Sequence, residues 1–180
     1  MNFEIDEQQR DFAASIDAAL GSADLPGAVR AWAAGDAAPG RKVWGTLTDL
    51  GVTALVVPEE HDGIGAHPVD LVVALERLGA HCVPGPVTES IAVAPILLAS
   101  DAQRGAALAA GELIATAAIA PDSPRAVDAD FAGLILVAEN GEVREGTAGA
   151  SHDSLDPSRK LFDVKASGDG WAADVQRARA

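Results

Sequence analysis

The stretch GELIATAAI (residues 111–119) decides the fold class, because the sequence pattern changes there from helix to strand. Before it, apolar residues recur at helical spacing and are separated by glycine and proline. From Leu113 to Ile119 a short apolar run lies between glycine and proline, which is typical of a strand. The sequence therefore predicts an α+β protein, a helical bundle followed by a small, shortened β domain.

The residues before this stretch predict a series of helices. Asp6 and Gln9 are spaced as a capping box, and glycines follow several of the apolar runs as stop signals. Pro95 should remove one hydrogen bond and kink its helix. We expect an extended segment or a tight connection over residues 52–57 and a glycine-containing loop over 58–68. The predicted helices cover residues 6–20, 26–34, 39–50, 69–78 (closed by Gly79), 88–99 and 101–110.

The residues after it predict strands over 133–138 and 161–166. Asn140-Gly141 between apolar residues is a strong signal for a two-residue hairpin. Residues 168–170 (Gly-Asp-Gly) should end the last strand, and 171–180 should begin a new helix with Trp171 and Val175 exposed. These features divide the chain into a helical domain (1–112), a shortened β domain (113–168) and the start of a C-terminal helix (169–180).

Composition and charge exclude several classes of partner. The 180 residues are 48% hydrophobic and 22% charged, as in a packed globular protein. The formal net charge is -14, so nucleic acid and anionic membrane surfaces are poor partners. No apolar run approaches the roughly 20 residues needed for a membrane span, and the acidic, polar N-terminus does not read as a secretory signal. The expected location is the cytoplasm.

The candidate metal ligands do not form a pattern. The chain has one cysteine, Cys82, which excludes an intrachain disulfide and a thiolate cluster. Its expected role is that of a small buried hydrophobic residue. The histidines His61, His67, His81 and His152 lack metal-binding spacing. We therefore predict no metal site.

The remaining chemical candidates each have a structural explanation. Residues 62–65 (Asp-Gly-Ile-Gly) lack the third glycine of a dinucleotide fingerprint and predict a tight loop with positive φ. Glu59 and Glu60 are adjacent and cannot face each other as an acid/base pair. Residues 151–153 (Ser-His-Asp) are too close in sequence for a triad, and Arg159-Lys160 is a solvated basic pair. We therefore predict no catalytic residue in this chain and leave the cofactor-binding residues unassigned.

A series of short motifs runs along the chain: WGTLTDLG (44–51), VPEEHDGIG (57–65), LERLG (75–79), VPGPVTE (83–89), AVAPILL (92–98), GELIAT (111–116) and DPSRKL (156–161). Taken in this order and spacing, the first of them resemble the N-terminal helical domain of the acyl-CoA dehydrogenases. The similarity continues into the middle β domain of that family and covers essentially the whole chain. The 83–98 region is similar to actinobacterial members that act on CoA thioesters, including those of steroid side chains.

The resemblance implies a flavoprotein of lipid metabolism, with FAD as cofactor and an acyl-CoA as substrate. Members of the family hold the flavin with a loop resembling TEPxAGSD, and residues 118–124 (AIAPDSP) lack its threonine and its glycine-serine pair. No room for the following strands remains between Pro124 and Phe131. The family's catalytic glutamate belongs to a C-terminal helical bundle that has no counterpart in these 180 residues. FAD is therefore expected to be bound mainly by a partner subunit or by a missing C-terminal region.

Three interpretations follow from this resemblance. The chain could be the flavin-poor subunit of a heteromeric enzyme, such as a heterotetramer, with a second acyl-CoA dehydrogenase-like subunit supplying base and flavin contacts. It could instead be the front part of a homomeric dehydrogenase, or a degenerate interaction module without enzymatic activity. The altered flavin loop favours the first. Exposed apolar residues at 91–98, at Trp171 and at Val175 would then require that partner for solubility.

Overall fold

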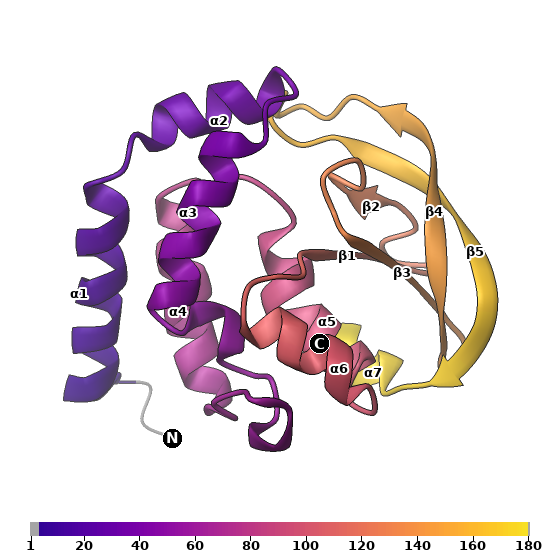
Figure 1. Cartoon of the computed structure of the whole chain (residues 1–180), viewed down its shortest axis with the longest axis horizontal. Helices are drawn as coiled ribbons and strands as arrows, with labels where there is room; N and C mark the ends of the chain where they lie inside the picture. The colour runs from indigo at the N-terminus through magenta and orange to yellow at the C-terminus, as the bar shows by residue number, and fades with distance from the viewer. Residues whose placement is uncertain (1–3, 180) are drawn as a thin grey trace.

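A computed structural model describes residues 4–179 and confirms the α+β architecture, with most helices on one side of a mixed sheet (Figure 1). The first part contains α1 (Glu7–Gly21), α2 (Leu25–Ala33), α3 (Ala38–Asp49), η1 (Val52–Ala54), η2 (Glu59–His61), α4 (Pro68–Ala80), η3 (Glu89–Val93), α5 (Ala94–Leu97) and α6 (Ala102–Ala109). The second contains β1 (Ala115–Ile119), β2 (Ala126–Val127), β3 (Leu134–Glu139), β4 (Glu142–His152), β5 (Leu161–Ala172) and α7 (Val175–Arg179).

Local capping groups set most of the predicted helix ends. The Asp6 carboxylate accepts a hydrogen bond from the Gln9 backbone, and the Gln9 side chain completes the capping box. Asp101 caps α6 in the same way through the Arg104 backbone. Gly51 has φ 75°, which ends α3 in the left-handed conformation that glycine adopts without strain. The predictions at these positions are confirmed. They succeed because each depends only on residues close in sequence.

The predicted end of α4 and the predicted burial of Cys82 are both wrong. The helix continues through Gly79 to Ala80. Cys82 takes the left-handed position after it, with φ 52°, and the Val83 N–H donates to the Leu78 carbonyl. This is the Schellman pattern that closes helices. The closure directs Cys82 outward, so its side chain is exposed.

The apolar helix predicted over 88–99 is two helical segments. Residues Glu89–Val93 form the π-helical turn η3, and the α-helical hydrogen bonding of α5 covers only Ala94–Leu97. Pro95 lies in the first turn of α5, where its missing N–H is tolerated. The expected irregularity is thus present, and it takes the form of a widened turn before the proline. The Ser90 hydroxyl in this turn accepts a hydrogen bond from the Ala115 backbone and fixes η3 to β1.

The sheet has the strand order β1-β3-β4-β5-β2. Strands β1 and β3 are parallel and the other neighbouring pairs are antiparallel. Asn140 and Gly141 have φ 51° and 82°, the conformation of a type I′ turn, which confirms the predicted hairpin between β3 and β4. The expectation of no strand between Pro124 and Phe131 is wrong, because the two-residue β2 pairs there with β5.

The predicted break at residues 168–170 is also wrong. Strand β5 continues to Ala172, and the pairing moves from Glu145–Ser167 to Val143–Trp171. The residues between Ser167 and Trp171 are therefore accommodated as a bulge, with Gly168 at φ 70°. Trp171 lies in a strand rather than at a helix start, and the following helix α7 is confined to Val175–Arg179.

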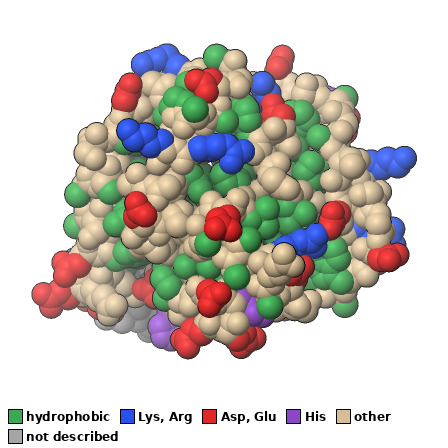
Figure 2. Space-filling model, in the orientation of Figure 1, with side chains coloured by type: hydrophobic (Ala, Val, Ile, Leu, Met, Phe, Trp, Pro, Cys, Tyr) green, Lys and Arg blue, Asp and Glu red, His purple; other side chains and the backbone are tan. Residues whose placement is uncertain are grey.

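The apolar residues expected to be exposed are covered instead. The Trp171 indole N–H donates to the Leu97 carbonyl at 2.8 Å, and the Arg104 guanidinium lies over its ring. Val175 is only 4% exposed, and Leu97 is fully buried. The exposed large hydrophobic side chains are elsewhere, at Ile64, Val69, Val72 and Leu155. Figure 2 shows the hydrophobic side chains of one face in small groups between polar ones.

Packing joins the helices to the sheet. One core lies among α1 to α4, around Ile16, Leu20 and Leu47. A second contains residues of α5, α6 and α7 together with β1, β3 and β4, including Leu97, Leu136 and Val143. The division at 1–112, 113–168 and 169–180 stays a proposal about segments of the chain, and its second boundary falls within β5. None of the helices in the described part combines the length and apolar character needed to cross a membrane.

Candidate functional site

The loop over residues 57–65 is a closed structural turn. The backbone N–H groups of Gly63, Ile64 and Gly65 donate to the carbonyls of Pro58, Ala54 and Val57. Asp62 and Gly65 have φ 62° and 60°, as the tight-loop interpretation predicts. Because these donors are already used within the chain, the loop has none of them free for a phosphate.

The adjacent carboxylates of this loop, Glu59 and Glu60, are both exposed. Next to them, His61 packs on α6, where an added Cβ at Gly105 would lie 3.0 Å from His61. The loop therefore packs closely against α6 at His61. Among residues 4–179, neither glutamate has a side-chain hydrogen bond or an ion pair.

The four histidines lie in separate places, and the described residues contain no group of His, Cys, Asp and Glu suited to a metal ion. His67 precedes α4, and its N–H donates to Asp70. His152 lies 2.9 Å from Asp163 of β5, so it does not pair with its sequence neighbours Ser151 and Asp153. The pKa of Asp163 is lowered, first by His152 and then by Arg125. His152 of β4 therefore forms a surface ion pair with Asp163 of β5 and is not part of a triad with Ser151 and Asp153.

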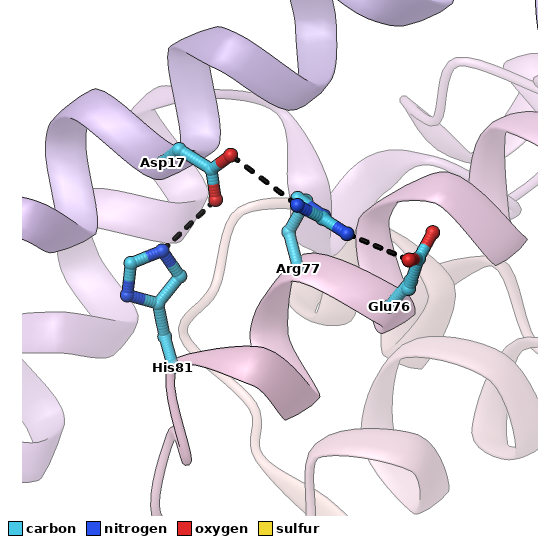
Figure 3. Close-up of polar contacts among 4 residues, drawn as sticks. All are labelled: Asp17, Glu76, Arg77 and His81. Carbon is cyan, nitrogen blue, oxygen red and sulfur yellow. Dashed lines mark hydrogen bonds and ion pairs between the residues drawn. The ribbon is translucent and has the colours of Figure 1, made fainter.

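Asp17 joins α1 to the end of α4 (Figure 3). Its carboxylate lies 2.9 Å from His81 Nε2 and 3.5 Å from Arg77 Nη1. Arg77 also pairs with Glu76 at 2.6 Å. Because every charged group in Figure 3 has a partner within the group, this cluster stabilises helix packing and leaves no free acid or base.

A buried carboxylate connects the helices to the sheet. Asp128, 1% exposed, accepts hydrogen bonds from the Trp32 indole N–H at 3.2 Å and from the Lys160 backbone at 2.9 Å. Its pKa is raised, first by burial, while the hydrogen bonds from Lys160 and Trp32 act in the opposite direction. The Trp32 ring also contacts Phe131 at a centroid distance of 4.3 Å. Asp128 therefore joins three segments that are remote in sequence.

A second carboxyl group is buried nearby. Glu89 begins the π-helical turn, and its Oε2 atom is buried without a hydrogen-bond partner among the described residues. Burial raises the pKa of Glu89; the charge of Arg159 opposes this increase and the charge of Asp128 adds to it. π-Helical turns are frequent at functional sites. The charges of Glu89, Asp128 and Arg159 thus act on one another across three separate segments of the chain.

An open cleft of about 370 Å³ adjoins this group. Its walls come from α2, from the end of α4 and the connection to η3, and from the β4–β5 connection. Thr88, Ser158 and Arg159 are among its polar lining residues, and Cys82 lies at its edge. The helical part and the sheet part therefore form this cleft together. Arg159, interpreted from sequence as solvated, lines it, while the Lys160 backbone binds Asp128.

Residues 118–124 correspond to the TEPxAGSD loop in the resemblance described above. Several of their backbone groups form hydrogen bonds within the chain. Ile119 and Ser123 exchange two backbone hydrogen bonds, and the Ala120 N–H donates to the Ala138 carbonyl. Arg179 of α7 donates to the Ala120 carbonyl and lies 3.4 Å from Asp122. Pro121 and Pro124 have no N–H. The N–H groups of Ile119, Ala120 and Ser123 are therefore not free for a flavin.

Glu89 and Asp128 were missed by the sequence analysis. Glu89 follows Thr88 at the start of an apolar run, where an acidic residue is ordinarily explained by the helix dipole. Asp128 lies in a connection without a recognisable motif. Only the hydrogen bonds from Trp32 and Lys160 and the nearby charge of Arg159, all from residues distant in sequence, make these carboxylates distinctive.

Glu89 predicts a pH-dependent change in stability. Because its pKa is raised in the folded state, its contribution to stability is fully present below its unfolded pKa and is lost as pH rises through the folded value. We expect Glu89→Gln to be more stable than wild type near pH 8 and to lose that advantage near pH 4. Urea unfolding across this range measures it. Glu60→Gln, at an exposed position, should show no such trend.

Comparison with known proteins gives a family match and relatives that agree with each other. Residues 6–111 match the family described as acyl-CoA dehydrogenase, N-terminal domain. Acyl-CoA dehydrogenase IpdE2 of Mycobacterium tuberculosis is 32% identical over 142 residues, which are 76% of this chain and 44% of that protein. This chain therefore spans less than half the length of that curated relative.

Solved structures share the fold. The ChsE4-ChsE5 complex from Mycobacterium tuberculosis matches with a TM-score of 0.69 and 18% identity, covering 99% of this chain and 60% of that chain. A glutaryl-CoA dehydrogenase from Mycobacterium smegmatis in complex with FADH2 matches with a TM-score of 0.69 and 15% identity, covering 95% and 55%. At these identities the likeness concerns the fold.

Proposed function

The chain belongs to the acyl-CoA dehydrogenase family, and on that premise we propose that it is one subunit of a heteromeric acyl-CoA dehydrogenase. The complete enzyme would remove hydrogen from the α and β carbons of a CoA thioester. A second acyl-CoA dehydrogenase-like subunit would supply the catalytic base and most contacts to FAD. The acyl group implied by the resemblance, a steroid side chain, belongs to this proposal.

The observation that carries the proposal is the state of the loop at residues 118–124. Its N–H groups at Ile119, Ala120 and Ser123 already donate within the chain, and Arg179 of α7 binds it from outside. A loop that holds a flavin needs free donors and close backbone approach. The occupied donors support flavin contacts from another chain.

The carboxylates of this chain support the same assignment of the base. A general base must be within hydrogen-bond reach of the proton that it removes. Glu59 and Glu60 are exposed on a closed loop, and Asp128 is occupied by Trp32 and Lys160. The Glu89 Oε2 atom is buried without a hydrogen-bond partner among the described residues, so no neighbouring group positions it as a base. We therefore assign the base to the partner.

An alternative proposal is that the chain is the front part of a homomeric dehydrogenase. The coverage of only 44% of the IpdE2 relative is the observation that favours it. Under that proposal the base and the flavin contacts would lie in a further segment of the same protein. Sequencing the gene beyond the codon for Ala180 separates the two proposals, because a long helical continuation would support the second.

We expect the purified chain to retain no flavin. After incubation with excess FAD and gel filtration, absorbance near 450 nm should be at background, because the donors at residues 119–123 are occupied. The matched sample is the same chain co-purified with its second subunit, which should be yellow. Stoichiometric flavin on the isolated chain would contradict the proposal.

Changing carboxylates of this chain should leave the chemical step intact. For Glu59→Gln and Glu89→Gln in the assembled enzyme, we expect kcat per bound flavin to be unchanged, with any loss of activity following the amount of complex. Steady-state rates with flavin quantification and gel filtration measure both quantities. A large fall in kcat per flavin with assembly unaltered would place the base in this chain.

A further inference from the structure

The cleft beside η3 has an apolar body and a charged rim. Its volume of about 370 Å³ lies within the range of small-molecule sites, roughly 300–1,000 Å³. The polar groups Thr88, Ser158 and Arg159 lie among its lining residues. The apolar lining comes from Val29, Leu75, Leu78, Val83 and Val87. A ligand with an apolar body and one polar end would match both.

The two charged residues of the cleft, Asp156 and Arg159, differ in whether their side chains have hydrogen-bond partners. The Asp156 carboxylate accepts hydrogen bonds from the Ser158 N–H at 2.9 Å and the Ser158 hydroxyl at 2.7 Å. These bonds lower the pKa of Asp156. By contrast, no ion pair or side-chain hydrogen bond involves the Arg159 guanidinium within the described residues. The Arg159 guanidinium is therefore the charged group of the cleft with free hydrogen-bond donors, and Asp156, which stays charged, acts on it through space.

The buried carboxylates do not neutralise Arg159 by direct contact. Both oxygens of Asp128 are taken, by Trp32 and by the Lys160 backbone. Burial raises the pKa of Glu89, so its charged form is disfavoured. Both groups affect Arg159 only through space, and the five donors of its guanidinium stay available for a planar, bidentate acceptor.

We propose that this cleft binds an amphipathic carboxylate, with the carboxylate on the Arg159 guanidinium and the hydrocarbon body against Val83, Val87 and Leu78. Arginine recognises carboxylates in a two-point geometry that also fixes the ligand's orientation. Thr88 lines the same cleft, and its hydroxyl can act as a further donor. The inference concerns the isolated chain and does not depend on the heteromeric enzyme.

Three probes of equal chain length test the choice of head group. Octanoate, octan-1-ol and octylammonium are titrated into the full chain by calorimetry, below their micelle concentrations and near pH 7.5, where both ionisable heads are charged. We expect octanoate to bind about tenfold more tightly than octan-1-ol, and octylammonium to bind most weakly. Amide shifts at Thr88 and Ser158 in NMR spectra of the wild type should locate the ligand.

Arginine variants test whether the ligand carboxylate binds the Arg159 guanidinium. Arg159→Gln should abolish the preference for octanoate over octan-1-ol while retaining the affinity for octan-1-ol, and Arg159→Lys should retain part of the preference. Arg125→Gln removes an equal charge that pairs with Asp163 and should keep the full preference. Circular dichroism checks that each variant is folded.

Several results would overturn the proposal. They are equal binding of octanoate and octan-1-ol, tighter binding of octylammonium, a preference that survives Arg159→Gln, or shifts that occur away from Thr88 and Ser158. The wild-type probe series and the shift map require no variant, so a folding defect in one arginine variant does not prevent a decision.

Discussion

Replacing Gly63 with alanine is expected to destabilise the fold by about 3 kcal/mol, because overpacking against the backbone cannot be relieved by a rotamer change. An added Cβ would lie 1.9 Å from the Val57 carbonyl oxygen and 2.3 Å from its carbon. The loop would have to open, which also breaks the Gly63 hydrogen bond to Pro58. Urea unfolding at neutral pH measures the change.

Gly45→Ala is the matched control. Gly45 lies within α3, and an added Cβ meets nothing within 4 Å. Alanine should therefore stabilise the helix by about 0.5–1 kcal/mol. A Gly63→Ala variant as stable as wild type would show that the 57–65 loop is not closed against Val57.

Asp128→Ala is expected to cost about 3 kcal/mol. The change leaves the Trp32 indole N–H and the Lys160 N–H without their acceptor in a buried position, at about 1–3 kcal/mol for each unsatisfied group. Asp128 also has φ 48°, a conformation that aspartate and asparagine adopt more readily than alanine does. Chemical denaturation of the variant tests both effects together.

Asp128→Asn separates the acceptor from the charge. Asparagine keeps one acceptor oxygen and tolerates the positive φ, so we expect a smaller cost of about 1 kcal/mol. Because burial raises the pKa of Asp128, its contribution to stability is lost as pH rises through the folded value, and asparagine removes that dependence. Asp130→Ala, whose carboxylate lies 3.8 Å from Lys160 on the surface, should change stability by less than about 1 kcal/mol. Equal stability of Asp128→Ala and Asp130→Ala would refute the role given to Asp128.

Features that depend on near neighbours could be predicted from the sequence alone. The capping box at Asp6, the cap at Asp101, the left-handed Gly51 and the Asn140-Gly141 hairpin each need only a few adjacent residues. The change from helix to strand after Gly111 is equally local. The motifs resembling the acyl-CoA dehydrogenases are likewise linear, and the match over residues 6–111 confirms the family.

Tertiary packing decided the rest. Trp171 was expected at an exposed helix start, yet it extends β5 because Leu97 offers a hydrogen-bond acceptor and α5 offers an apolar surface. Glu89 and Asp128 became notable only because the fold buries Asp128, half-buries Glu89 and brings their charges within reach of each other and of Arg159. Burial, and with it the cost of an unpaired polar group, depends on residues far away in the chain. That is why linear patterns located the elements and the family, whereas the cleft and its charges required the folded molecule.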